Sequence, residues 1–404
     1  MKEDSGLRLS LRGQGHHPNR LETVRRQLVK QGLTLRQISD SNPTQYGLFD
    51  PRIPDVLARH LDSAIRYTPD PKGWLPAREA LAARFGGQPD DYWLTASTSE
   101  AYSWLLTALA DPGASVAVPQ PGYPLFEALT QLTSLRLVTY DSHYFHPSGW
   151  EYDLDSVKRA LDDPGIRAFV IVSPNNPTGA YIGQPDCQVI TKLLIEKRLP
   201  LIADEVFFPF TLDDSPHQRV AEMTQLADAD SVVITLDGCS KLLAAPQLKL
   251  SWLRLQGPAK LTRPLADSLD MIADAFLSVN SIVACALPDL LELANDCIER
   301  VASRCRANLA TLSELGDNYR VRQTQAGWMA LVDLPPVFET DAMPETLLQA
   351  GLDAHPGWFY DIDSSTVIAL SLLPEPSMFA DSLQQIQTIT GGLKCSPANN
   401  VSVD

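Results

Sequence analysis

The chain has 404 residues, of which 44% are hydrophobic and 20% are charged, as in soluble globular proteins long enough for two domains. Its formal net charge of −16 disfavours nucleic acid and anionic membrane surfaces as partners, because both are themselves negatively charged. No apolar stretch is long enough to span a bilayer.

The chain begins with a polar segment, up to about Asn19, that we expect to be mobile. This segment lacks the apolar core of a signal peptide. The cysteines are scattered without CxxC spacing: Cys187, Cys239, Cys285, Cys297, Cys305 and Cys395. We therefore expect reduced thiols in a cytoplasmic protein, with neither a disulfide framework nor a zinc site or other metal site.

The first two thirds of the chain alternate strand and helix patterns. A first helix is expected at 21–31, and an irregular segment rich in Pro and Gly at 41–51. Short β-branched runs then end in Pro, Asp or Gly, at 115–119, 167–174, 199–207 and 231–238, with amphipathic stretches between them. This alternation predicts an α/β fold, in which helices cover both faces of a mostly parallel sheet.

The last third of the chain predicts a smaller α+β domain. A helical region at 269–315 leads to strands at 329–335 and 365–374, with a helix at 344–350. We divide the chain into an N-terminal arm and helix (1–45), which packs on the small domain, a large domain (46–267), and an interdomain helix with the small C-terminal domain (268–404). The final residues, SPANNVSVD, are expected to be frayed.

Polar residues follow several of the predicted strands, where active sites of open α/β sheets lie. Residues 96–100 follow the run YWLT and open a helix whose amides suit a phosphate. Taken alone, these residues are better explained by a plain N-cap made by Ser97 or Ser99. Tyr123, after the strand at 115–119, suits stacking on a flat heteroaromatic ring, or else packs as a turn residue.

The next two strand ends offer an amide and a carboxylate. In SPNNPTG (173–179), two prolines restrict the backbone and present Asn176, whose amide can donate to a phenolate oxygen. Asp204 lies among apolar residues, where a carboxylate needs a cationic or hydrogen-bonded partner. A protonated pyridine nitrogen is such a partner, and a helix cap is the alternative.

Lysines follow the last strand of this series. Lys241, preceded by Ser240, comes directly after a buried strand, and partial loss of water favours its neutral, nucleophilic amine. Lys249 is a second cation that suits a phosphate, unless it is an ordinary surface lysine.

Taken together, these motifs resemble one enzyme family. The segments ASTSEA, PGYPLF, SPNNPTG, DEVF and SKLLAAPQLKLSW, in this order, are similar to those of fold-type I enzymes dependent on pyridoxal 5'-phosphate, in the class I/II aminotransferase family to which aspartate aminotransferase belongs. The resemblance covers roughly residues 35–390 and implies the aspartate-aminotransferase fold.

The resemblance implies a role for each motif. Lys241 would bind the cofactor as a Schiff base and act as general base, and Asp204 would bind the pyridine nitrogen. The other cofactor contacts it implies come from Asn176 at the ring oxygen, Tyr123 stacked on the ring, and Thr98, Ser99, Ser240 and Lys249 at the phosphate. Tyr67 matches a tyrosine that reaches the phosphate of a neighbouring subunit, which implies a homodimer with shared active sites.

The sequence departs from the family at three places. Lys249 stands where the family has an arginine, and Phe207 where it has a tyrosine, which removes one hydrogen bond to the ring oxygen. Ala369 or a neighbour replaces the arginine that holds the substrate carboxylate. Arg52 is a candidate substitute, unless it is an exposed loop arginine, and the aromatic segment 355–361 lines the pocket or else the small-domain core.

The resemblance leaves the reaction open between three classes. The first is an aminotransferase that moves an amino group from an amino acid to a 2-oxo acid or a similar carbonyl acceptor. The second is a lyase or a β- or γ-replacement enzyme for an unusual amino acid, which the missing arginine favours. The third, a non-catalytic binding protein, is disfavoured by the intact Lys241, Asp204 and Asn176.

Overall fold

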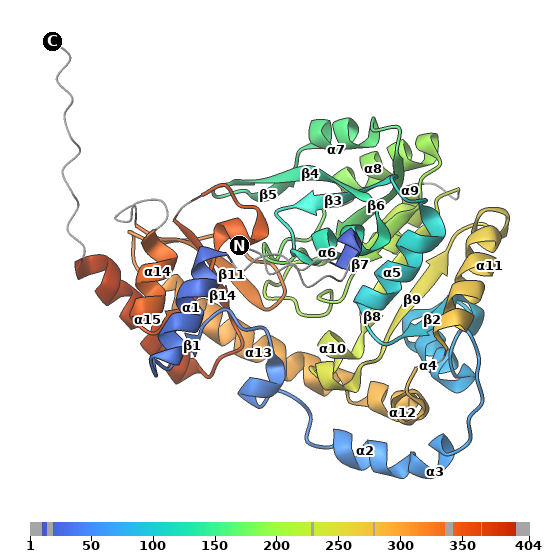
Figure 1. Ribbon diagram of the computed structural model, residues 1–404, viewed down its shortest axis with the longest axis horizontal. Coiled ribbons are helices and arrows are strands. Elements are labelled where there is room, and N and C mark those ends of the chain that lie inside the picture. Colours follow the sequence, from blue (N-terminus) through green and yellow to red (C-terminus); the bar gives the residue numbers. More distant parts are fainter. Residues whose placement is uncertain are drawn as a thin grey trace.

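The computed structural model describes residues 10–13, 19–227, 230–277, 279–335, 342–364 and 366–392. Most of the N-terminal segment up to Asn19, Cys395 and the segment SPANNVSVD lie outside these ranges. A large α/β part and a smaller part with its own sheet stand side by side (Figure 1). The helix α13 (Ala294–Ser313) runs from one part into the other.

The large sheet has the order β2-β9-β8-β7-β6-β3-β4-β5. Its strands are β2 (Tyr92–Thr95), β3 (Ser115–Gln120), β4 (Arg136–Phe145), β5 (Gly149–Tyr152), β6 (Ile166–Val172), β7 (Leu201–Asp204), β8 (Val233–Gly238) and β9 (Ser251–Gln256). The central strands β8, β7, β6, β3 and β4 are parallel. The strands β9 and β5 run antiparallel to their neighbours, so the sheet is mostly parallel, as predicted.

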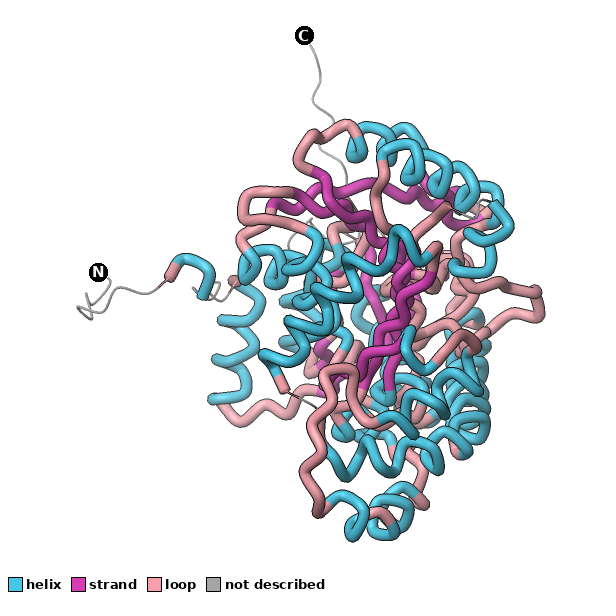
Figure 2. Tube along the Cα trace, turned by 90° about the vertical axis from the view of Figure 1, so that its right-hand side faces the viewer, coloured by secondary structure: helices cyan, strands magenta, loops and turns pink. Residues whose placement is uncertain are grey.

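Helices cover both faces of this sheet, which explains why its strands are apolar almost without interruption (Figure 2). On β6, Ala168 and Val170 pack toward one set of helices, and Phe169 and Ile171 toward the other. The first set is α5 (Thr98–Leu109), α6 (Leu125–Thr133) and α11 (Ala259–Phe276). The second is α7 (Leu154–Leu161), α8 (Gln184–Lys197) and α9 (Val220–Ala227).

The smaller part is built on an antiparallel sheet of order β10-β11-β14-β13. Its strands are β10 (Arg320–Val321), β11 (Met329–Asp333), β13 (His355–Pro356) and β14 (Val367–Ser371). Apolar residues of α13, α14 (Ala342–Gln349) and α15 (Pro376–Gly392) pack on one face. The N-terminal helix α1 (Arg20–Lys30) contacts α14, and β1 (Arg36–Gln37) pairs with β12 (Leu352–Asp353).

Another apolar cluster joins the helices below the sheet in Figure 1. It involves α2 (Ile53–Arg59), α4 (Leu75–Phe85), α10 (Cys239–Leu242) and α12 (Ser281–Glu292), and α3 (Leu61–Ala64) contacts α12. Short 3-10 turns are η1 (Leu11–Gly13), η2 (Pro43–Tyr46), η3 (Pro89–Asp91), η4 (Pro246–Leu248) and η5 (Gly357–Tyr360).

The fold class predicted from the sequence is confirmed: a mostly parallel sheet between helices, and a smaller α+β unit toward the C-terminus. The predicted helical region at 269–315 is correct in content but consists of three helices, α11, α12 and α13. The exact domain boundaries stay a prediction. Within the described ranges, no helix has the length and apolar character needed to cross a membrane.

Candidate functional site

A cavity of about 790 Å³ opens at the edge of the large sheet that faces the smaller part. It is lined by every residue that the sequence predicted for the cofactor site except Tyr67: Thr98, Ser99, Tyr123, Asn176, Asp204, Ser240, Lys241 and Lys249. Tyr67 lies elsewhere, in the loop before α4, and is 65% exposed.

Strand direction explains why these residues meet. The strands β3, β6, β7 and β8 are parallel, so their carboxyl ends share one edge of the sheet. Both β2 and β8 are antiparallel to β9, and β2 therefore ends at this edge as well. Because β9 runs the other way, it begins at this edge, and Lys249, two residues before its start, lines the cavity.

The N-terminus of α5 points polar groups at the cavity. Ser97 caps the helix, since its side chain accepts from the amide of Glu100 at 3.1 Å, and the Glu100 carboxylate accepts from the amide of Ala96 at 2.5 Å. Within the described part of the chain, no acceptor meets the amides of Thr98 and Ser99. The N-cap made by Ser97 therefore leaves two amides at this helix end open to an anion.

Lys241 lies between aromatic rings and acidic groups. Its Nζ is 5.1 Å from the ring centroid of Phe207 and 4.7 Å from that of Trp328. Burial lowers the pKa of Lys241 to about 8, because removal of water disfavours the ammonium, and the charges of Asp204 and Asp40 only partly offset this. At pH 7 about a tenth of such an amine is neutral and nucleophilic, against about one part in three thousand for an exposed lysine.

Asp204, at the end of β7, is held by two donors. Tyr102 donates its hydroxyl hydrogen to Oδ2 at 3.0 Å, and the amide of Val206 donates to Oδ1 at 3.3 Å. Burial nevertheless raises the pKa of Asp204 to about 6, and these hydrogen bonds and Lys241 moderate the rise. A cation placed next to this carboxylate would stabilise its ionised form.

The loop that carries Asn176 is fixed by its neighbours. The Asn175 side chain donates to the carbonyl of Pro121 at 3.2 Å, which ties the loop to the turn after β3. Gly179 has φ of +67°, and its carbonyl accepts from the amides of Gln325 and Ala326 at 3.1 and 2.9 Å. The Oδ1 atom of Asn176 is buried and has no partner among the described residues, and its Nδ2 meets no acceptor of the described chain, so the side-chain nitrogen can still donate.

The wall toward the smaller part comes from the segment 355–361. Tyr123 is 49% exposed, and in the same turn the amide of Gly122 donates to the carbonyl of Tyr360 at 3.2 Å. His355 and Tyr360 line the cavity and share a hydrogen bond of 3.0 Å between Nδ1 and the hydroxyl group. Of this segment's aromatic residues, Phe359 packs on the core beside Tyr360, and Trp358 is 44% exposed.

The candidate role of Arg52 as an anion anchor is wrong for its own chain. Arg52 precedes α2, and its guanidinium bonds Asp50 at 2.7 Å and Asp296 at 2.6 Å. It does not line the cavity. The alternative, an exposed loop arginine, is closer to the structure: the side chain of Arg52 is half-exposed and pairs with the buried Asp50 and the exposed Asp296.

Sequence reasoning missed several residues around the cavity. Tyr102 lies one helical turn after Thr98, so its spacing placed it on the same face of α5 as the predicted phosphate contact. Asp40 lines the cavity from the segment between β1 and η2, and Trp328 reaches Lys241 from the start of β11. No local pattern marks either residue, because each reaches the site through contacts distant in sequence.

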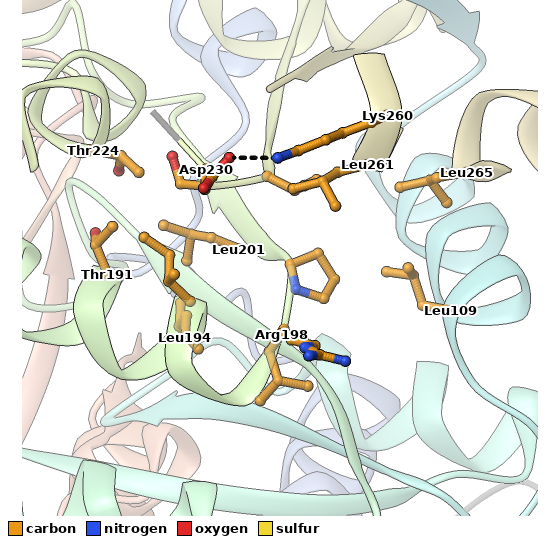
Figure 3. Close-up of a pocket in the computed structure, with 15 residues that line it drawn as sticks. Leu109, Thr191, Leu194, Arg198, Leu201, Thr224, Asp230, Lys260, Leu261 and Leu265 are labelled. Atoms are coloured by element: carbon orange, nitrogen blue, oxygen red, sulfur yellow. Dashed lines mark ion pairs between the residues drawn. The ribbon is translucent and has the colours of Figure 1, made fainter. Parts of the chain in front are cut away.

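A second hollow, of about 520 Å³, lies at the opposite, amino-terminal ends of β7 and β8. Leucines such as Leu194, Leu201 and Leu265 surround it, and an ion pair of Lys260 with Asp230 stands at one side (Figure 3). None of the predicted site residues lines it.

Comparison with known proteins gives one consistent result. The model of the family "Aminotransferase class I and II" matches residues 46–352. The glutamate-pyruvate aminotransferase AlaA of Escherichia coli K12 is 30% identical over 265 residues, which are 63% of this chain and span 63% of that relative's length.

Solved structures extend the likeness to almost the whole fold. A crystal structure of an aminotransferase from Escherichia coli superposes with a TM-score of 0.83 at 23% identity, and covers 96% of this chain and 99% of its own. The alanine aminotransferase of Pyrococcus furiosus gives 0.84 at 20% identity, with 95% and 100% covered. With its motifs at the sheet edge and the family match over most of its length, the chain belongs to the aminotransferase class I and II family.

Proposed function

We propose that this protein is an aminotransferase that uses pyridoxal 5'-phosphate to move an amino group from an amino acid to a 2-oxo acid or a similar carbonyl compound. The observation that carries the proposal is the approach of Lys241 and Asp204 to one cavity from neighbouring strand ends. Members of the family depend on this cofactor. The relative AlaA is named for glutamate and pyruvate, which are the first substrates to test.

The residues of the cavity fit this cofactor group by group. Its phosphate suits the open amides of Thr98 and Ser99 and the charge of Lys249, with Ser240 nearby. The side-chain nitrogen of Asn176, which donates to no acceptor of the described chain, suits the ring oxygen. Tyr123 stands at the open side, where it would stack on the ring.

Asp204 is half-buried, no cation of the described chain is bonded to it, and it suits a protonated ring nitrogen. Since the pKa of Asp204 is about 6, most of these carboxyl groups are ionised at pH 7 to 8, and a cation would increase that fraction. Tyr102 fixes the orientation of the carboxylate.

Bound pyridoxal phosphate supplies an aldehyde that a primary amine attacks and a ring that accepts electrons from carbon. Lys241 provides the amine for attachment, and its lowered pKa keeps part of it neutral near pH 8. Once released from attachment, the same Nζ accepts the proton from the carbon that bears the substrate amine. Phe207 and Trp328 place aromatic rings beside this nitrogen.

The proposal includes a homodimer in the cytoplasm. Tyr67 lies outside the cavity of its own chain and is exposed, which supports a contact with the phosphate of a partner subunit. The absence of a membrane-spanning helix among the described residues and the buried, unpaired thiols from Cys187 to Cys305 are compatible with that compartment.

Absorbance of the loaded protein tests the proposal. We expect an amino acid to remove the absorbance of the aldehyde form, and a 2-oxo acid to restore it, with one new amino acid formed for each amine transferred. Release of ammonia and a 2-oxo acid, with the aldehyde form regenerated in each turnover, would instead identify a lyase. A protein that binds the cofactor and responds to no amine would contradict both.

A further inference from the structure

The charged side chains that line the cavity do not suit a substrate that carries a second carboxylate. Its basic side chains are Lys241, Lys249 and His355, and its acidic ones are Asp40 and Asp204. No arginine of the described chain lines it. Ala369 on β14, where the resemblance expects an arginine, is fully buried, and its carbonyl accepts from the hydroxyl of Ser39.

Two arginines of the smaller part are each held by a carboxylate of the same chain. Arg25 binds both oxygens of Asp353 at 2.7 and 2.8 Å. Arg322 binds both oxygens of Asp333 at 3.0 and 2.9 Å. A carboxylate would have to compete with a bidentate partner for either guanidinium, and such pairs are among the strongest in proteins.

His355 does not replace an arginine. Burial lowers its pKa, and Nδ1 already shares a hydrogen bond with the hydroxyl group of Tyr360. Its ring is therefore mainly neutral at pH 7. Under the proposed function, Lys241, Lys249 and Asp204 serve the cofactor, and Asp40 is the charged side chain that remains for the substrate.

Asp40 is held in place at the cavity. The preceding residue, Ser39, is buried and bridges the smaller sheet, since it donates to the carbonyl of Ala369 and accepts from the amide of His355 at 2.8 Å. The Asp40 Oδ1 atom accepts from the amide of Asn42 at 3.0 Å. No cation of the described chain forms an ion pair with it, and its charge acts on both Lys241 and His355.

Resting on the proposed function, we propose that Asp40 selects a substrate with a second positive group, an ammonium or guanidinium, beside the amine that reacts. A cationic group of the substrate would give this carboxylate the ionic partner that the described chain does not provide. A substrate with an acidic side chain would place like charges in the same confined space, which costs binding energy. Two classes of compound carry such a cation: basic α-amino acids and diamines.

Matched pairs of amines test the proposal on the loaded protein. Lysine is compared with norleucine, which has the same chain length without the ammonium, and cadaverine with pentylamine. For each amine, the rate of change in cofactor absorbance and the concentration at half-saturation are measured. We expect the charged member of at least one pair to have a ratio of rate to half-saturation about tenfold or more higher, as for one charge-assisted hydrogen bond. A preference for lysine over norleucine would identify a basic α-amino acid as the substrate that carries the cation. A preference for cadaverine over pentylamine would identify a diamine.

Asp40→Asn tests whether Asp40 causes the preference for a charged amine. Asparagine removes the charge but keeps an oxygen that accepts from the amide of Asn42. We expect the ratio between the charged and uncharged members of a pair to fall toward one, and Asp62→Asn, an exposed acid on α3, to leave the ratio unchanged. Equal reactivity of both members in the unaltered protein, or faster reaction of glutamate than of lysine, overturns the role of Asp40 but leaves the aminotransferase intact. If no amine reacts, the proposed function fails and this inference with it.

Discussion

The two sides of the cavity are built in different ways. The side on the large sheet consists of strand ends, and each end supplies one polar group: Asn176 after β6, Asp204 on β7 and Lys241 after β8. The side toward the smaller part includes Asp40, between β1 and η2, and His355 on the short strand β13, and contacts distant in sequence hold both in place. On the first side Lys241, Asp204 and Asn176 fit the family pattern, although Lys249 and Phe207 depart from it. The second side lacks the arginine that the resemblance expects near Ala369, so the proposed choice of substrate rests less on the family than the proposed chemistry does.

Lys241→Ala gives the largest expected effect, because it removes the residue proposed both to attach the cofactor and to accept the proton. We expect the absorbance of the attached cofactor to disappear and the rate of amine transfer to fall by at least about a thousandfold. Spectra and single-turnover rates measure both. Persistence of the absorbance at full strength would mean that another lysine is attached to the cofactor.

Capture of pyridoxal phosphate by the cofactor-free protein depends on pH through the same amine. Since only the neutral form attacks, and the pKa of Lys241 is lowered to about 8, we expect the rate to rise about tenfold per pH unit below 8 and to level off above it. Free Nα-acetyl-lysine serves as the control, and its rate should keep rising toward pH 10. A protein rate that follows the control would show that burial does not lower the pKa.

Gly179→Ala tests the contact that joins the two sides. A methyl group there would lie 2.5 Å from the carbonyl oxygen of Ala326, and φ is +67°. We expect the free energy of unfolding to fall by about 2 kcal/mol or more. Gly47→Ala is the matched control, because φ is +65° but no atom lies within 4 Å of the added methyl group. Equal losses in thermal or denaturant unfolding would assign the effect to backbone conformation alone.

Tyr102→Phe should have a smaller effect on the sheet side. The hydroxyl group stabilises the ionised carboxylate of Asp204, so its removal raises the pKa of Asp204 above about 6. We expect cofactor affinity to fall several-fold at pH 7, and its loss on acidification to begin at a higher pH. Cofactor dissociation constants between pH 5 and 8 measure this. A uniform loss at every pH would indicate a packing defect instead.

Arg52→Ala should have the smallest effect of all. Arg52 lies outside the cavity and pairs with Asp50 and Asp296, and Arg300 still binds Asp50 at 3.1 Å when Arg52 is removed. We expect kcat/KM for every amino acid to stay within about twofold of its original value. A selective rise in KM for amino acids with a free carboxylate would restore Arg52 as an anion anchor, acting across the proposed dimer.

The sequence predicted the centre of the large sheet better than its edge or the helices that follow it. The parallel core strands were predicted because both faces are covered, which makes their sequences continuously apolar. The hairpin β4–β5 was not, since it lies at the sheet edge and β4 mixes buried and exposed positions without strict alternation. The three helices of residues 259–313 were predicted as one region for two reasons. No glycine marks the breaks between them, and the prolines, which would suggest breaks, lie within α11 and α12 instead.

The candidate site shows a similar contrast. Residues at the carboxyl ends of strands were brought to one cavity as predicted, although their roles stay predictions. Asp40 and Trp328 were missed, because their positions depend on the pairing of β1 with β12 and on the contact between Gly179 and the segment before β11. Arg52 was misplaced because a sequence does not reveal that two nearby acids already neutralise an arginine.

The reversed direction of β9 makes the chain length between the two cavity lysines critical. From Lys241 the backbone turns through α10 and η4 and re-enters the sheet at Ser251, so a compact excursion returns Lys249 to the same edge. Inserting or deleting one residue in that connection would move the ammonium group of one lysine away from that of the other. The turn at 146–148 joins two strands at the edge of the sheet formed by β4 and β5, where we expect changes in length to be tolerated. Natural variation in length should therefore be rare in the first connection and common in the second.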